Sequence, residues 1–238
     1  MAVMPATHDR SIDVRYATLE DCHEATGLVV VVDVIRAFTT AAHVLDRGAA
    51  EIWPVAGVDE ALALRRANPD VLVIGEEGGI KVDGFDAGNS PSELDSVDFA
   101  GRIVVQRTSA GTQAIARSSG ADHLLAASFV CAGATVRAIR ALAEGPVTFV
   151  VTGVDARRDG DEDRACAEYL AALVQGTRPD PAPYLARVPA STAGREFLDA
   201  EGPHRPVADL DLAMELDRFT VALQVDRGER DVLRVRRE

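Results

Sequence analysis

Asp33 and Arg36 stand where a carboxylate and a guanidinium could take part in chemistry. The five residues before Asp33, 28–32, are all apolar and predict a buried strand, and a stretch of helical length begins shortly after Arg36. In open α/β sheets, ligands collect beyond the carboxyl ends of the strands. Asp33 could therefore hold a metal ion and Arg36 an anion, although a local ion pair that caps the helix explains the two residues equally well.

A strand-terminal aspartate is also the nucleophile of haloacid-dehalogenase phosphatases. That family requires a second aspartate two residues later, and this chain has Ile35 at that position. The mismatch excludes the family. The sequence leaves open whether Asp33 would act as a nucleophile, a base or a metal ligand.

The stretch QRTSAGTQ has the composition of an anion-binding turn. The hydroxyls of Thr108 and Ser109 precede Gly111 and Thr112 at a predicted helix start, where backbone N–H groups and the helix dipole favour an oxyanion. Arg107 adds a full positive charge. An ordinary N-cap and turn is the alternative. A P-loop is excluded, because its GxxxxGK[ST] spacing and its lysine are missing.

Four acidic residues fall within the segment DGDED, 159–163, ahead of a predicted helix. Capping by the helix dipole explains one or two carboxylates at such a position. Mg²⁺ prefers hard oxygen ligands and commonly takes one or two protein carboxylates, with water and substrate phosphate completing its shell. The segment therefore predicts a magnesium site, and it does not match an EF-hand loop.

Cys131 and Arg137 have the C-x5-R spacing of cysteine-dependent phosphatases. In such enzymes a thiolate attacks phosphorus while the arginine and loop amides hold the oxygens. The histidine and glycine usual in that motif are replaced here by Val130 and Ala134. A cysteine-dependent phosphatase is kept as an alternative.

The elements that must position these residues alternate between runs rich in Val, Leu and Ile and alanine-rich stretches of helical length. This alternation predicts an α/β sandwich with a largely parallel or mixed sheet. The predicted strands are 13–16, 28–33, 51–55, 71–74, 102–106, 123–126 and 147–151. The predicted helices are 39–47, 59–67, 112–118, 132–143 and 162–175.

The C-terminal part has a different pattern. Four prolines between residues 179 and 189 predict a loop, and short helices are predicted over 191–200 and 209–216. The runs FTVALQV and DVLRVRR flank DRGER and predict a β-hairpin. We expect a single domain over 1–238, with a helical and hairpin extension from about residue 178.

The composition limits the class of partner. The formal net charge of -13 argues against a general nucleic-acid binder or a protein of anionic membranes. Three widely spaced cysteines and no signal-like apolar segment at the N-terminus fit the reducing cytoplasm. We therefore expect a cytoplasmic protein with a small anionic ligand, and the sequence leaves a homo-oligomer open.

The strand-end segments together resemble the 2-phosphosulfolactate phosphatase (ComB-type) family. They follow the family order from about residue 28 to 170, as DVIRAFTT (33–40), GEEGG (75–79), GFDAGNSP (84–91), TSAGT (108–112), Ser128 and the pair Glu162 and Asp163. The resemblance implies a three-layer α/β/α fold and a Mg²⁺-dependent phosphatase. Its reaction converts 2-phospho-3-sulfolactate and water to 3-sulfolactate and phosphate, a step towards coenzyme M.

Two positions depart from the family pattern. Ala110 and Cys131 stand where the family usually has asparagine, and both are predicted at the mouth of the site. Arg107 could compensate, since its guanidinium fork suits sulfonate or phosphate. The departures concern the substrate more than the reaction, and they keep a non-catalytic small-anion-binding homologue as a second alternative.

The resemblance also implies a set of site residues. Asp33 and Arg36 would be catalytic, and Mg²⁺ would be held by Asp33, Glu76, Glu162 and Asp163. The phosphorylated substrate would be bound by Asn89, Ser90, Arg107, Thr108, Ser109, Gly111, Thr112 and Ser128.

Overall fold

Ten strands form one mixed sheet in the computed structural model, within the residues that the structure describes: 12–154, 158–199, 204–227 and 233–237. The sheet order is β1-β8-β2-β7-β9-β10-β3-β6-β4-β5. The strands are β1 (Val14–Thr18), β2 (Gly27–Val32), β3 (Glu51–Val55), β4 (Leu72–Glu77), β5 (Ile80–Lys81), β6 (Ile103–Arg107), β7 (Ala121–Ala127), β8 (Val147–Val151), β9 (Leu223–Arg227) and β10 (Leu233–Arg237).

The helices follow the predicted pattern in the first three quarters of the chain. They are α1 (Ala37–Asp46), α2 (Val58–Ala67), α3 (Gly111–Arg117), α4 (Ala132–Leu142), α5 (Asp161–Val174), α6 (Ala182–Leu185), α7 (Arg187–Ala190), α8 (Thr192–Leu198) and α9 (Ala208–Ala213). Short 3-10 turns lie at η1 (Cys22–Glu24), η2 (Pro91–Ser96) and η3 (Phe129–Cys131). The seven strands and five helices predicted before residue 176 are confirmed, with ends that differ by at most three residues.

β2 shows why its sequence is continuously apolar. Val29 and Val31 enter one hydrophobic core, whereas Leu28, Val30 and Val32 enter the core on the opposite face of the sheet. Its neighbours β7 and β8 are parallel to it and lie one on each side. A strand that is covered on both faces needs apolar residues at every position, not at alternate ones.

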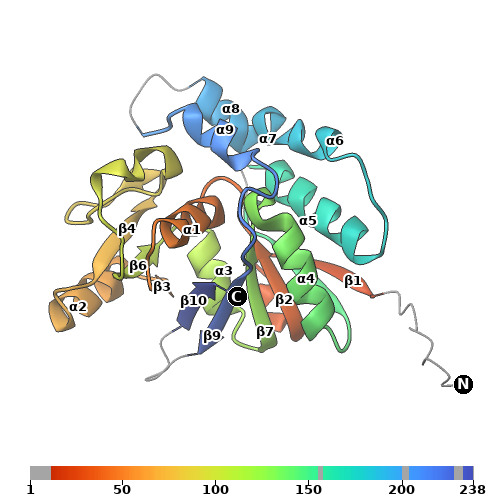
Figure 1. Ribbon diagram of the computed structural model, residues 1–238, viewed down its shortest axis with the longest axis horizontal. Coiled ribbons are helices and arrows are strands. Elements are labelled where there is room, and N and C mark those ends of the chain that lie inside the picture. Colours follow the sequence, from red (N-terminus) through yellow and green to blue (C-terminus); the bar gives the residue numbers. More distant parts are fainter. Residues whose placement is uncertain (1–11, 155–157, 200–203, 228–232, 238) are drawn as a thin grey trace, which may run out of the picture.

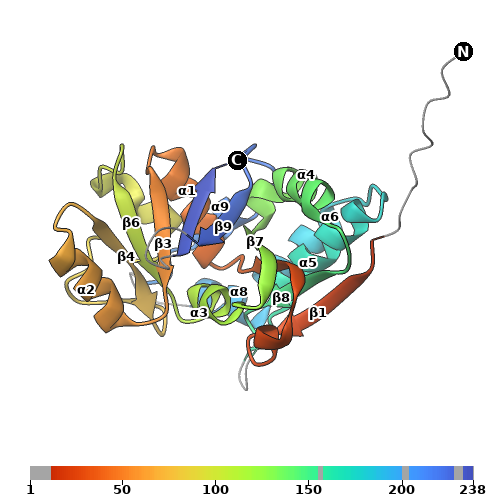
Figure 2. The ribbon, with the colours of Figure 1, turned by 90° about the horizontal axis from the view of Figure 1, so that it is seen from below.

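Helices cover both faces of the sheet, so the architecture is the expected three-layer α/β/α sandwich. One core packs α1 and α3 against residues from both halves of the sheet. On the other face, α4 and α5 cover the half that contains β2, β7 and β8. There α2 covers the half that contains β3, β4 and β6 (Figures 1 and 2).

The predicted C-terminal hairpin is confirmed as β9 and β10, and it lies inside the main sheet. β9 pairs with β7 and β10 pairs with β3, both antiparallel, so the hairpin joins the two parallel halves (Figure 2). Leu223, Val225 and Val235 are consequently buried in the central core.

The prediction of a loop around the four prolines is wrong in part, because α6 and α7 form there. Pro181 is directly before α6, and Pro183 and Pro189 lie inside these four-residue helices. Proline is tolerated in a first helical turn because the N–H that it lacks has no partner within the helix there. The helices α7, α8 and α9 lie together across one end of the molecule, above α1 in the view of Figure 1.

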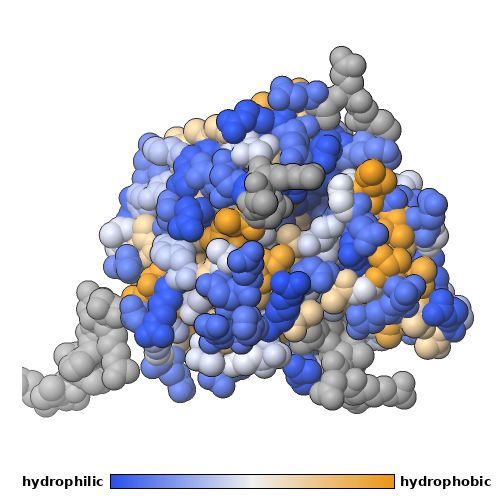
Figure 3. Space-filling view, turned by 180° about the vertical axis from the view of Figure 1, so that it is seen from behind, coloured by the Kyte–Doolittle hydropathy of each residue, from blue (hydrophilic) through white to orange (hydrophobic). Residues whose placement is uncertain are grey.

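Hydrophilic side chains cover most of the face shown in Figure 3, and apolar side chains gather there in separate groups. Within the described residues, none of the helices is long and apolar enough to cross a membrane.

Candidate active site

A cavity of about 380 Å³ lies where the carboxyl ends of β2, β4 and β6 meet the C-terminal helices. The strand ends and their loops contribute Asp33, Arg36, Glu76, Asn89, Thr108 and Ser109 to its wall. The segment before α5, α8 and the segment before α9 contribute Arg158, Glu196, Phe197 and Arg205. The cavity therefore has both carboxylates and guanidinium groups on its surface.

Asp33 follows β2 and accepts a hydrogen bond from the Ala37 amide at the start of α1, at 2.9 Å. Its side chain thus stabilises the helix start, as the capping explanation predicted. Burial raises the pKa of Asp33, the charge of Glu76 adds to the rise and amide and hydroxyl donors lower it, with the result that the pKa is about 6. Asp33 is therefore a buried carboxylate on the cavity wall that can change its protonation near neutral pH.

Arg36 pairs with Asp209 of α9 and not with Asp33, so the predicted local ion pair is wrong. The two charged groups are 2.9 Å apart and both are almost fully buried. The Arg36 guanidinium also lies over the Phe197 ring, 5.0 Å from its centroid, and donates to the His204 carbonyl at 3.2 Å. α8 and α9 therefore fix Arg36 in place beside the cavity.

Glu76 joins the loop after β4 to the loop after β6. Its carboxylate accepts from the Gly79 amide at 2.6 Å, from the Ser109 amide at 2.6 Å and from the Ser109 hydroxyl at 2.9 Å. Gly75, one residue earlier, has φ +134, and a Cβ there would lie 1.8 Å from the Arg107 carbonyl oxygen. Glycine is required at that position, which explains the first residue of the GEEGG segment.

The TSAGT turn forms at the start of α3, but its hydroxyls bond within the protein. Thr112 donates its amide to the Thr108 hydroxyl at 3.0 Å, and the Ser109 hydroxyl donates to Glu76. Arg107 donates to the carbonyl of Glu76 at 2.7 Å and to the carboxylate of Glu77 at 2.9 Å, and it is not on the cavity wall. In this structure Arg107 orders the loop after β4.

Glu162 and Asp163 open α5 and are both buried, but neither lies on the wall of the cavity. Asp163 accepts from the Val34 amide at 2.7 Å, the Gly153 amide at 2.9 Å and the Thr152 hydroxyl at 3.1 Å. These bonds hold the residues after β2 against those after β8. Burial and the charge of Glu162 raise the pKa of Asp163 well above its usual value.

Glu162 is different, because its Oε2 atom is buried without a hydrogen-bond partner among the described residues. Burial, with a smaller contribution from the charge of Asp33, raises the pKa of Glu162 to about 7. A buried carboxylate oxygen without a partner is unfavourable unless a proton or a cation satisfies it. Glu162 and Asp33 are thus the two carboxylates whose chemistry fits a bound cation.

A divalent cation would have few protein ligands here. Within the described residues, no group of three or more His, Cys, Asp or Glu side chains is placed to hold a metal ion. Mg²⁺ does not require such a group, since one or two carboxylates with water and substrate oxygens complete its shell. Asp33 on the cavity wall and Glu162, with its unpartnered oxygen, are therefore the carboxylates that could hold Mg²⁺.

Of the four remaining predicted substrate ligands, one lines the cavity and three do not. Asn89 lines the cavity, and its Oδ1 accepts from Gln106 at 3.3 Å. Ser90 donates to Asp209 at 2.9 Å, and Ser128 is fully buried and bonded to Thr39. Gly111 lies against Asp33, where a Cβ would be 2.7 Å from the carboxylate.

The two residues that depart from the family pattern lie in different environments. Ala110 lines the cavity, whereas Cys131 is fully buried, with its sulfur 3.5 Å from the Ser128 carbonyl oxygen. Burial raises the pKa of the Cys131 thiol, and Arg137 donates to the Thr220 carbonyl at the surface. A buried thiol with a raised pKa is a poor nucleophile. The structure thus removes the support for a cysteine-dependent phosphatase.

Five residues of the site were not predicted from the sequence. Four of them line the cavity, namely Arg158, Glu196, Phe197 and Arg205, and the fifth is Asp209, the partner of Arg36. Arg158 is adjacent to the predicted acidic segment, so the charge pattern could have indicated it. The other four lie after residue 190, where no local motif marks them.

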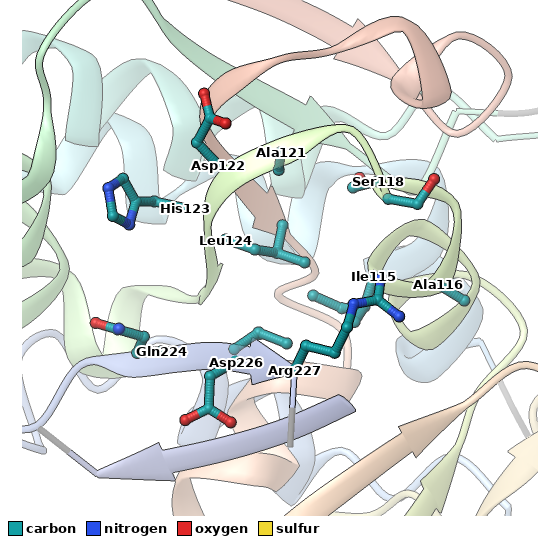
Figure 4. Close-up of a pocket in the computed structure, with 12 residues that line it drawn as sticks. Ile115, Ala116, Ser118, Ala121, Asp122, His123, Leu124, Gln224, Asp226 and Arg227 are labelled. Atoms are coloured by element: carbon teal, nitrogen blue, oxygen red, sulfur yellow. The ribbon is translucent and has the colours of Figure 1, made fainter. Parts of the chain in front are cut away.

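A second cavity, of about 290 Å³, lies elsewhere, between the end of α3, the start of β7 and β9. Figure 4 shows His123 and Leu124 of β7 on one side and Gln224 and Asp226 of β9 on the other. None of the predicted site residues lines it.

Comparisons with known proteins agree with the resemblance in the sequence. A model of the family described as 2-phosphosulpholactate phosphatase matches residues 15–188. Three proteins named "Probable 2-phosphosulfolactate phosphatase" are similar to this chain. The one from Bacillus subtilis is 34% identical over 175 residues, 73% of this chain and 76% of that protein. The Deinococcus radiodurans protein is 42% identical over 163 residues (67% and 68%), and the Thermus thermophilus protein 37% over 195 (74% and 81%).

Proposed function

The chain belongs to the 2-phosphosulpholactate phosphatase family, and from this membership we propose that it is a Mg²⁺-dependent phosphomonoester hydrolase. The substrate is 2-phospho-3-sulfolactate, and the products are 3-sulfolactate and inorganic phosphate. Water supplies the oxygen that appears in phosphate, and the sulfolactate oxygen leaves with a proton. The departure at Ala110 lies on the cavity wall, so the substrate is the part of the proposal that most needs a direct test.

The observation that carries the proposal is the mixed charge of one cavity. Asp33 and Glu76 bring carboxylates to its wall, and Arg36 and Arg205 bring guanidinium groups. A phosphomonoester with further acidic groups needs cationic groups to bind its oxygens and a carboxylate to handle a proton or a cation. The cavity combines both kinds of group within a space suited to a small molecule.

Mg²⁺ would be held by Asp33 and Glu162, and when bound it would neutralise charge on the phosphoryl oxygens. The orphaned Glu162 oxygen supports this assignment. Glu76 and Asp163 serve as the residues that hold the surrounding loops, through the amides of Ser109, Gly79, Val34 and Gly153.

Asp33 and Arg36 each have a further role in this proposal. Asp33, with a pKa of about 6, is mostly ionised at neutral pH and can accept a proton or a cation at its carboxylate. Arg36 is held by Asp209 and Phe197, so its guanidinium has a fixed position from which it can bind the anion.

We place the reaction in the cytoplasm, supported by the three cysteines, all of which are free and buried. A homo-oligomer stays a prediction.

Phosphate release from 2-phosphosulfolactate tests the proposal directly. We expect the purified chain to release phosphate with Mg²⁺ and to stop in EDTA, with 3-sulfolactate identified by mass spectrometry. Acid quenching during a single turnover, followed by mass spectrometry of the peptide that contains Asp33, distinguishes a phosphoaspartate at Asp33 from direct attack by water. Turnover of generic phosphomonoesters without turnover of 2-phosphosulfolactate would refute the substrate, and saturable binding without any turnover would indicate a non-catalytic homologue.

A further inference from the structure

One buried carboxylate connects the helical wall to two segments on the sheet side of the cavity. Asp209 of α9 is 1% exposed and accepts hydrogen bonds from Arg36, Ser90 and Ser92. Arg36 follows β2, whereas the two serines lie at the start of η2. Asp209 itself is not on the cavity wall, so it can influence a bound molecule only through the residues that it holds.

The two carboxylate oxygens of Asp209 have separate partners. Oδ2 accepts from Arg36 Nη1 at 2.9 Å. Oδ1 accepts from the Ser90 hydroxyl at 2.9 Å, from the Ser92 amide at 3.1 Å and from the Ser92 hydroxyl at 2.6 Å. One oxygen therefore fixes the guanidinium, and the other fixes the start of η2.

The contact with η2 also determines the position of Asn89. The first amides of a helical turn have no partner within the turn, and the side chain of Ser90, at the N-cap position of η2, does not supply one. Asp209 supplies that acceptor to the Ser92 amide. Asn89 directly precedes Ser90 and lines the cavity together with Arg36. Asp209 thus holds two neighbours of the bound molecule, one through each oxygen.

We propose that Asp209 is a positioning residue of the active site, which holds Arg36 and Asn89 at the spacing that the anionic substrate requires. The inference rests on the proposed function, in which Arg36 binds the anion, and on the prediction that Asn89 is a substrate ligand. Side chains that are ordered before the substrate binds lose less conformational freedom when it binds.

The residues that contact the substrate and the residue that aligns them then belong to different parts of the chain. Arg36 and Asn89 lie within residues 15–188, which match the family model, and Asp209 lies beyond them. The C-terminal helix α9 is therefore required for the reaction although it does not line the cavity through Asp209.

Asp209→Asn separates the two arms of this arrangement. Three donors surround Oδ1, so the carbonyl oxygen of the new amide is expected there and its NH₂ group faces Arg36. The variant should therefore release the guanidinium and keep the contacts to η2. Asp211→Asn is the matched control, since Asp211 is exposed on the same helix.

The measurement is kcat/KM for 2-phosphosulfolactate with Mg²⁺. We expect a fall of about 10-fold or more in Asp209→Asn, as for the loss of a charge-assisted hydrogen bond, and a value within about 2-fold of the wild type in Asp211→Asn. In an Arg36→Gln background, Asp209→Asn should lower kcat/KM by less than about 2-fold, because the group through which it acts is already absent.

A general loosening of α9 would instead lower kcat/KM by the same factor in both backgrounds, and that result, or unchanged kcat/KM in Asp209→Asn, would overturn the proposal. Unfolding midpoints ensure that all variants are compared while folded. If Asp209→Asn does not fold, Ser90→Ala decides. Its loss, expected to be about 3-fold, should disappear in an Asn89→Ala background, and losses that multiply would reject the positioning role.

Failure of the proposed function gives a different result. If the wild type does not hydrolyse 2-phosphosulfolactate, the proposed function fails, and calorimetric binding of inorganic phosphate decides the role of Asp209. Binding about 10-fold weaker in Asp209→Asn than in Asp211→Asn supports the role. Equal binding by the two variants, or no binding by the wild type, rejects it.

Discussion

Individual residues at this site contribute both to the stability of the fold and to the proposed chemistry. Asp33 accepts from the amide that starts α1 and also lies on the cavity wall. Sequence reasoning could find Asp33 because a strand-end carboxylate is recognisable locally. It could not separate Glu162 from Asp163, because adjacent acids differ only in which amides and hydroxyls reach them in the folded chain.

Glu162→Gln should stabilise the metal-free protein at pH 8. Folding raises the pKa of Glu162 from 4.5 to about 7, so the unfolded chain loses this proton first as the pH rises. The free energy of unfolding therefore decreases as the pH rises from 4.5 to about 7. Above pH 7 the ionised, buried carboxylate destabilises the folded protein fully. Glu162→Gln should then raise the free energy of unfolding by on the order of 2 kcal/mol at pH 8, and by much less near pH 5.

Urea unfolding in EDTA at the two pH values measures this difference. Glu144→Gln is the control, because Glu144 is exposed at the end of α4. A Glu162→Gln protein that is less stable at pH 8, or a gain independent of pH, would contradict the assignment of a buried, unpaired carboxylate.

Gly111→Ala should damage both folding and the site. The new Cβ would lie 2.7 Å from the Asp33 carboxylate and 2.7 Å from the Ala37 Cβ, and one of these groups must move. Overpacking of this kind costs about 1–3 kcal/mol. We expect a lower unfolding midpoint and reduced kcat, whereas Gly145→Ala, at a position with open space, serves as the control for a new methyl group. Wild-type kcat in Gly111→Ala would show that Asp33 can move without loss.

At the scale of elements, local patterns predicted most strands and helices, but not which strands pair. The hairpin β9–β10 is visible in the sequence as two β-rich runs around a turn, yet its position between β7 and β3 depends on partners about 100 and 180 residues away. The helices α8 and α9 were predicted as short helices, and their place on the cavity wall was not, because only tertiary contacts bring Phe197 to Arg36.

Leu223→Ala tests whether the hairpin is part of the core. Leu223 is fully buried in the central core, so truncation should destabilise the protein by about 2–5 kcal/mol. Leu198→Ala is the matched control, since Leu198 on α8 is 52% exposed and should change stability by less than about 0.5 kcal/mol. Equal effects of the two substitutions on urea unfolding would indicate that the hairpin is only an appendage.

At the scale of the whole molecule, the cavity depends on three segments that are far apart in the chain. β2 with α1 supplies Asp33 and Arg36, the β4 and β6 loops supply Glu76 and Ser109, and the last quarter supplies Glu196, Arg205 and Asp209. The net charge of -13 argues against broad classes of partner, but the arginines that line this cavity come together only on folding. Fold class and the sheet-side half of the site were therefore predictable, and the helical wall was not.

The most direct test of the central claim, that hydrolysis occurs at this cavity, is kcat/KM for 2-phosphosulfolactate in Asp33→Asn compared with Asp46→Asn. Asp46 lies at the exposed end of the same helix that Asp33 caps. In the presence of Mg²⁺ we predict a loss of about 100-fold or more for Asp33→Asn, with wild-type activity in the control. Activity that survives Asp33→Asn, in a protein folded as stably as the wild type, would contradict the account.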